Sequence, residues 1–174
     1  PAGLLNFNDV KVRRGAKAKV DAVLNVRNGI EISTDSGLSA SDRVFASTIR
    51  VITRSSFDSA VDVSALTVEV TGGSTLGQLP TTASILRKLA LNVGTLTLDA
   101  ASRIDVTGHG FLGGETSTNP FGSRGMTVGF QAGSNNRNGG GYGGLGGSVG
   151  GEVNPVYGDF RDPNDVGSGG GGHF

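Results

Sequence analysis

The chain has 174 residues, which is long enough for one domain with a real core, and its 15 Lys and Arg balance its 15 Asp and Glu. A net charge of zero gives no reason to expect nucleic acid, an anionic membrane surface or a strongly acidic substrate as partner. Cysteine is absent, which excludes a disulfide framework and any thiolate metal site, and no apolar run approaches the roughly 18–20 residues that span a bilayer.

The first clear pattern lies in residues 16–32, where apolar and polar side chains alternate with the period of two that is typical of a β-strand. Ala18 and Val20 can face one side while Lys17 and Lys19 face the other. Asn28-Gly29 interrupts the pattern, and this dipeptide favours the positive φ angles of a tight turn. The segment therefore predicts a strand, a turn and a second strand.

Similar short stretches recur, each with two aliphatic residues around one small or polar residue. They are Leu24-Asn25-Val26, Ile49-Arg50-Val51, Val61-Asp62-Val63, Leu66-Thr67-Val68, Leu89-Ala90-Leu91, Leu96-Thr97-Leu98 and Ile104-Asp105-Val106. The stretches that start at Leu24, Ile49, Leu66 and Leu89 follow one another at irregular intervals, each close to the roughly 20 residues of one coil in a β-helix. The pattern predicts an all-β fold in which residues 1–107 form the coils of a parallel β-helix, or β-solenoid.

Two alternatives remain open at this point. An antiparallel β-sandwich also contains short alternating strands. Residues 84–89 place Ile85, Leu86 and Leu89 at helical spacing and are compatible with one helical turn. We favour the solenoid because Asn28-Gly29 is the one strong two-residue hairpin signal in the coil region.

Residues 108–174 differ sharply in composition, because they contain 23 of the 31 glycines. A segment so rich in glycine has few side chains to bury and loses much backbone entropy on ordering. Apolar residues are nevertheless scattered through it, which is unlike a flexible Gly/Ser linker. We expect long glycine-rich loops packed on the solenoid, with Tyr142, Tyr157 and Phe160 as the packing anchors.

Three motifs carry a family resemblance: Ile104–Gly110, the tract Gly139–Gly147, and Tyr157–Phe160 followed by Gly167–Gly172. Over residues 86–174 they resemble the glycine-rich β-helical segments of large bacterial cell-surface and adhesin-like proteins. The resemblance implies a right-handed parallel β-helix in an extracellular protein, with no catalytic residues to carry over.

The ends of the sequence add one further expectation. The chain begins at Pro1 rather than Met and stops in a glycine tract at Phe174. We therefore expect it to be a piece of a longer protein that continues into a further coil.

A calcium site is one hypothesis for Asp159, Asp162 and Asp165, which recur every three residues around a Pro-Asn turn. Ca²⁺ takes six to eight oxygen ligands, and a turn with several carboxylates can supply some of them. The spacing matches neither an EF-hand nor a calcium-roll repeat. The alternative, which we favour, is that these side chains form the turn and keep it soluble.

Other motifs are weaker. Five cations between Lys11 and Lys19 suit a sulfated glycan or a nucleic acid, but a solvated strand edge explains them better because no aromatic residues are interleaved. The tract 167–174 lacks the Lys-Ser/Thr ending of a phosphate-binding loop. His109 and His173 belong to no triad or zinc motif.

Asp99, Arg103 and Asp105 are the candidates for acid–base chemistry on a polysaccharide, although outward Asp and Arg are also normal on a solvated wall. We expect no catalytic residues and no cofactor apart from the hypothetical calcium. The preferred function is that of a non-catalytic extracellular structural protein that self-associates in a cell-surface fibre or assembly. The alternatives are an adhesin module that binds a glycan or a host surface, and a polysaccharide-active β-helical enzyme.

Overall fold

The computed structural model describes residues 3–173, which form two compact units. The first unit contains residues 3–79 and Lys88–Val106, and the second contains Pro80–Arg87 and residues 107–173. The division falls between residues 106 and 107, and a short segment from inside the coil region also belongs to the second unit.

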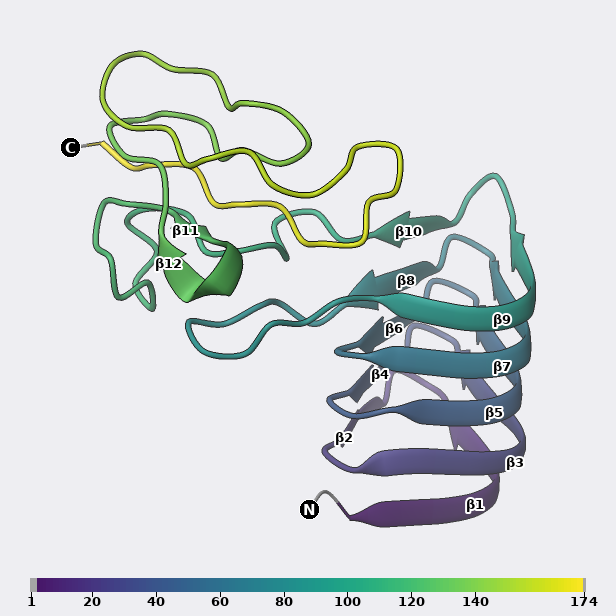
Figure 1. Cartoon of the computed structure of the whole chain (residues 1–174). Coiled ribbons are helices and arrows are strands. Elements are labelled where there is room, and N and C mark those ends of the chain that lie inside the picture. The colour runs from purple at the N-terminus through teal and green to yellow at the C-terminus, as the bar shows by residue number, and fades with distance from the viewer. Residues whose placement is uncertain (1–2, 174) are drawn as a thin grey trace. The chain divides into compact units, whose positions relative to one another are not determined.

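The first unit is a parallel β-solenoid built from alternating long and short strands (Figure 1). The long strands are β1 (Leu4–Val12), β3 (Val23–Ser33), β5 (Val44–Ile52), β7 (Asp62–Thr71) and β9 (Ala90–Leu98). The short strands are β2 (Lys17–Val20), β4 (Gly37–Ala40), β6 (Ser56–Ser59), β8 (Thr75–Gln78) and β10 (Arg103–Asp105). The long strands form one sheet in the order β1-β3-β5-β7-β9 and the short strands a second in the order β10-β8-β6-β4-β2. Every pairing in both sheets is parallel, which confirms the solenoid and rules out the antiparallel sandwich.

The register of the strands shows the length of one coil. Leu24 pairs with Val44, and Val44 pairs with Val63, so each of these coils takes roughly 20 residues, as is usual in a β-solenoid. The last step is longer, because Val63 pairs with Leu91. The chain leaves the coil over Pro80–Arg87 in this step, so a loop has been inserted without disturbing the stacked strands.

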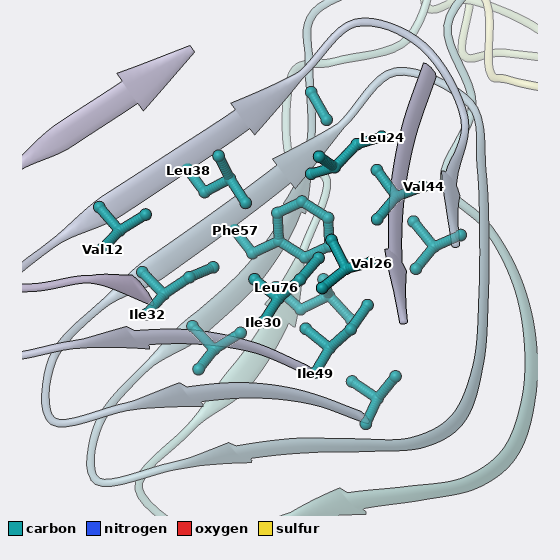
Figure 2. Packing of buried hydrophobic residues seen from close by; sticks show 14 of the residues in the cluster. Val12, Leu24, Val26, Ile30, Ile32, Leu38, Val44, Ile49, Phe57 and Leu76 are labelled. Atoms are coloured by element: carbon teal, nitrogen blue, oxygen red, sulfur yellow. The ribbon is translucent and has the colours of Figure 1, made fainter. Parts of the chain in front are cut away.

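Aliphatic side chains from successive coils stack into ladders in the interior (Figure 2). On the long strands Ile30, Ile49 and Val68 occupy equivalent positions, and each is at most 2% exposed. On the short strands Leu38 and Phe57 do the same and are at most 1% exposed. The two sheets thereby enclose a dry core, as the alternating pattern of the sequence predicts.

The corners between long and short strands repeat as well. Two successive residues have positive φ at each of four corners: Arg14 and Gly15, Thr34 and Asp35, Thr53 and Arg54, and Gly72 and Gly73. A buried serine follows three of these pairs. The Ser36 N–H donates to Ser55 Oγ (3.2 Å), and the Ser55 N–H donates to Ser74 Oγ (3.1 Å). The corners are therefore linked by a serine ladder that satisfies buried backbone donors.

The predicted turn at Asn28-Gly29 is wrong. Both residues lie inside β3, and Gly29 is not among the residues with positive φ. The pairing with β5 instead shifts register between Val26 and Gly29. The break in the sequence pattern marks a β-bulge, in which β3 carries one residue more than its neighbours β1 and β5 without ending the strand.

The predicted repeat was also placed in the wrong register. Ile49 is equivalent to Ile30 rather than to Leu24, and Leu66 is 71% exposed on the outer face. The error arises because aliphatic residues occur on both faces of the long strands, so their spacing alone does not reveal which ones stack. Residues 84–89 contain no helix.

The second unit contains very little regular structure. It has a two-stranded antiparallel sheet of β11 (Met126–Thr127) and β12 (Gln131–Ala132), with the 3₁₀ turn η1 (Val128–Phe130) between them. Within the described part of the chain, no helix has the length and apolar character needed to cross a membrane.

The glycine-rich unit is held together by an extended segment at residues 167–172. Its backbone exchanges hydrogen bonds with three separate segments: the Gly114 N–H donates to Gly170 O (2.8 Å), the Gly169 N–H to Met126 O (2.9 Å) and the Gly171 N–H to Asn138 O (2.8 Å). One extended segment thus joins three others through backbone groups alone.

Glycine is required where these segments cross. A Cβ atom on Gly169 would overlap the backbone of Leu112, and one on Gly125 would overlap the backbone of Gly169. The glycines therefore allow close backbone packing, which is the reason this unit is ordered with so few side chains in its interior.

Candidate functional site

The outer face of the sheet of long strands carries three shallow hollows. The largest, about 570 Å³, lies over β3, β5, β7 and β9, and its lining includes Asn25, Arg27, Phe45 and Leu66. A second of about 460 Å³ shares Asn25 and Arg27 with it. A third of about 460 Å³ shares Ser47 with the largest and continues toward Lys11 and Arg50. The shared residues make the three hollows neighbours on this face, and together they are called the trough.

An outward ladder of mostly polar residues lines the trough on the N-terminal side of the bulge. In strand order it contains Asn6, Asn25, Phe45, Ser64 and Asn92. Asn25 Nδ2 donates to Asn6 Oδ1 (2.9 Å). The Phe45 ring is 37% exposed, so the trough offers amides and a hydroxyl next to one aromatic surface.

Beyond the bulge the outward ladder is charged and alternates in sign. Lys11, Glu31, Arg50 and Glu69 follow one another from strand to strand. Arg50 Nε lies 2.9 Å from Glu69 Oε2, and Arg13 Nη2 lies 2.7 Å from Glu31 Oε1. Partial burial acts to raise the pKa of Glu31, but the hydrogen bond and charge of Arg13 outweigh it and hold that pKa below its ordinary value. The opposite charges therefore match across the coils.

The structure does not gather the three aspartates of the calcium hypothesis into a metal site. Asp159 Oδ1 accepts a hydrogen bond from the Arg161 N–H (2.8 Å), and the Asp165 N–H donates to the Tyr142 hydroxyl (3.4 Å). Asp159, Asp162 and Asp165 are all exposed. In residues 3–173 no group of three or more His, Cys, Asp or Glu side chains could hold a metal ion.

Two of the three predicted anchors come together. The rings of Tyr142 and Tyr157 pack edge to face, with centroids 5.4 Å apart, and the Tyr157 hydroxyl donates to Val166 O (2.6 Å). Burial raises the pKa of Tyr157, although a hydrogen bond from Ser168 opposes this effect. Phe160 is 66% exposed, with the Arg161 guanidinium 4.7 Å from its ring centroid.

The centre of the second unit is a polar cluster that the sequence analysis missed. Asn154 is 3% exposed, and its Oδ1 accepts hydrogen bonds from the Ser134 hydroxyl (2.9 Å) and the Gly141 N–H (2.8 Å). Its Nδ2 donates to Thr127 Oγ1 (3.2 Å) and Ser168 Oγ (3.2 Å). The sequence gives little sign of this buried cluster, because isolated Asn, Ser and Thr in a glycine tract resemble ordinary loop residues. Their ability to donate and accept hydrogen bonds is the one signal.

The candidate acid–base residues hold the last coil together. The Asp99 carboxylate accepts hydrogen bonds from the Gly72 N–H (2.7 Å) and the Ala101 N–H (3.2 Å). A hydrogen bond from Ser102, followed by that from Gly72, lowers the pKa of Asp99. Arg103 Nε lies 3.3 Å from Asp105 Oδ2. Asp99 thus caps a corner, and Arg103 and Asp105 form an ion pair.

The cationic edge predicted between Lys11 and Lys19 is partly neutralised. Arg13 is paired with Glu31, and Lys19 Nζ lies 2.9 Å from Asp21 Oδ2. Lys17 is exposed on β2. A run of cations in the sequence therefore becomes a set of separate surface contacts in the fold.

Comparison with known proteins finds no matching family model, no matching curated protein and no matching solved structure.

Proposed function

We propose that this chain is a non-catalytic extracellular structural protein, a β-solenoid segment of a bacterial cell-surface fibre or surface assembly that self-associates. The observation that carries the proposal is the set of inner ladders that runs in register through the stacked coils. Each coil repeats the contacts of the one before, and such a stack resists bending because every layer is hydrogen-bonded and packed to its neighbours.

The chemistry of the surface agrees with this role. Asp99 is occupied by backbone donors, and Asp105 is engaged by Arg103. The outer charges are paired between coils, and the net charge of zero offers no long-range repulsion between copies. These features favour a stiff structural protein whose copies can associate over an enzyme.

Negative-stain electron microscopy over a rising protein concentration tests the proposal. We expect elongated assemblies whose length increases with concentration. Monodisperse single particles at every concentration would contradict the self-association, and turnover of any polysaccharide in a panel of substrates would contradict the non-catalytic role.

The trough on the outer face favours a second candidate, an adhesin module that binds a glycan. Asparagine amides and the Arg27 guanidinium can bond sugar hydroxyls, and the exposed Phe45 ring can pack on a sugar ring. The hollows of the trough are shallow and lie next to one another across several coils, which suits an extended chain more than a small molecule.

A glycan array tests the second candidate. We expect Asn25→Ala and Phe45→Ala to weaken any observed binding by at least tenfold, about 1.4 kcal/mol. Thr97→Ala is the matched control, because Thr97 is exposed on β9 outside the residues that line the trough. Equal loss in the control, or an array without hits, would remove this candidate.

A further inference from the structure

The first coil presents inward-facing apolar side chains that the described residues leave uncovered. Leu5 stands in register with Leu24, and Phe7 with Val26. Leu24 and Val26 are 1% and 2% exposed, whereas Leu5 and Phe7 are 40% and 47% exposed. The positions are equivalent, so the exposure of Leu5 and Phe7 arises because β1 is the edge strand of its sheet.

The opposite edge of the same sheet has the same property. Leu96 is in register with Val68, and Leu98 with Val70. Val68 and Val70 are 2% and 0% exposed, whereas Leu96 and Leu98 are 39% and 44% exposed. β9 is the other edge strand of the sheet of long strands, so both ends of the stack present open hydrogen-bonding edges and apolar ladder positions.

The two edges match when the register is continued by one coil. The strand pairings from β1 through β9 show which residue of β9 is equivalent to each residue of β1. If β9 of one copy pairs with β1 of a second copy in this same register, four apolar pairs form. They are Leu91 on Leu5, Val93 on Phe7, Leu96 on Val10 and Leu98 on Val12. Each inner ladder then continues from one copy into the next.

The outer positions match as well. Asn92 would lie on Asn6, which repeats the amide pairing of Asn6 with Asn25 at 2.9 Å. Thr97 would lie on Lys11, so no like charges would be opposed there. From these correspondences we propose that copies of this chain associate end to end, with β9 of one copy pairing in parallel with β1 of the next.

The direction of stacking follows from the need to cover both edges. A symmetric contact between two β1 strands would leave Leu96 and Leu98 exposed in the dimer. A head-to-tail contact covers β1 and β9 alike and generates an open-ended filament when the rotation does not close. The inference rests on the self-association in the proposed function and specifies the surface that mediates it.

Sedimentation of the full chain at increasing concentration, with substitutions at each edge, tests the proposal. We expect Phe7→Lys and Leu98→Lys each to raise the concentration needed for association by at least tenfold, because each buries a charge against an apolar ladder. Thr67→Lys, exposed on the inner strand β7 and outside the residues that line the trough, is the control and should associate like the wild type. A mixture of the two edge variants should form dimers and nothing larger, because each retains one intact edge.

A second pair of variants changes only exposed residues, so that a loss of association cannot be attributed to misfolding. Asn6 and Asn92 are exposed, so Asn6→Lys with Asn92→Lys should fold but repel at the contact. Asn6→Lys with Asn92→Asp should restore association.

The outcomes separate the proposals. Assembly unchanged in all edge variants overturns the end-to-end contact but leaves self-association through another surface. Loss of assembly in Phe7→Lys but not in Leu98→Lys indicates a β1–β1 dimer and also overturns it. A wild type that stays monomeric overturns both this contact and the self-association of the proposed function.

Discussion

Individual asparagines do in the glycine-rich unit what strand pairing does in the solenoid. Asn138 is 1% exposed; its Nδ2 donates to Glu152 O (3.0 Å) and its Oδ1 accepts from the Val149 N–H (2.8 Å). Asn119 bonds Gly113 O (2.9 Å) in the same manner. An amide can donate and accept at once, so one side chain satisfies several backbone groups that no sheet pairs.

Asn154 is the member of this group whose loss should cost most. We expect Asn154→Ala to lower the free energy of unfolding by about 2–3 kcal/mol, because it leaves buried donors and acceptors without partners. Urea denaturation followed by circular dichroism measures this. Gln131→Ala is the control, since Gln131 is exposed, has a negative φ and donates a hydrogen bond to Gly129 O (3.1 Å). Equal destabilisation by both would contradict the prediction.

The positive φ angles at the corners strain the backbone of individual residues. Thr53 has φ of 57°, a conformation that is costly for a β-branched residue. We expect Thr53→Gly to raise the free energy of unfolding by roughly 0.5 kcal/mol, after allowing for the extra entropy of glycine in the unfolded chain. Thermal unfolding would detect the change.

Gly15 provides the reciprocal test at the equivalent corner. Its φ is +76°, and no atom lies within 4 Å of the place where a Cβ would stand. Gly15→Ala should therefore lower the free energy of unfolding by about 1 kcal/mol through backbone strain alone. A neutral Gly15→Ala would show that these corners relax into another conformation.

At the scale of the elements, the bulge in β3 keeps the inner ladders in register from β1 to β5. Before the bulge Leu24 and Val26 point inward, and after it Ile30 and Ile32 do so. β5 has one residue fewer between its two inward pairs, so the extra residue of β3 keeps Ile30 and Ile32 in the ladders of Ile49 and Val51.

The short strands contribute the largest buried side chain of the solenoid, and its truncation tests the ladder. Phe57 on β6 is 0% exposed and is in register with Leu38 and Leu76. We expect Phe57→Ala to cost about 3–5 kcal/mol, because a cavity opens between two well-packed coils. Phe45→Ala on the outer face should cost less than about 1 kcal/mol. Chemical denaturation of both variants makes the comparison, and similar costs would contradict the assigned faces of β5 and β6.

At the scale of the whole molecule, two ways of stabilising a chain coexist. The solenoid buries ladders of aliphatic side chains between hydrogen-bonded coils, whereas the glycine-rich unit packs backbone on backbone around residues 167–172. Charges add matched pairs on the surface of both units, such as Arg50 with Glu69 and Arg124 with Glu152.

Three carboxylates of the solenoid, those of Asp35, Glu31 and Asp99, predict how stability changes with acid. The Arg54 hydrogen bond lowers the pKa of Asp35, and Glu31 and Asp99 also have lowered pKa values. Because the folded pKa values lie below the unfolded ones, the carboxylates contribute fully above the ordinary values of 3.8 and 4.5, and the contribution is lost as pH falls through the folded values.

We therefore expect a melting temperature that changes little between pH 7 and 5 through these groups and falls by a few degrees below about pH 4.5. Differential scanning calorimetry across this range measures it. Asp35→Asn should remove part of the acid dependence. A melting temperature that rises below pH 4 would contradict the assignment of these ion pairs.

By itself the sequence determined the fold class and the faces of the first strands. Val20, Leu24 and Val26 point inward as the period of two predicts, because the hydrophobic pattern is a local consequence of burying one face of a strand. It also determined that the composition changes near residue 108, since glycine content is a property of the chain alone.

Only the tertiary structure decided the register of the coils, the bulge at Asn28-Gly29 and the trough. Stacking pairs residues that lie one coil apart, and which residue meets which depends on corner geometry and on inserted loops such as Pro80–Arg87 rather than on local preference. The order of the glycine-rich unit was decided in the same way, because backbone segments distant in sequence must meet before Asn154 can bond them.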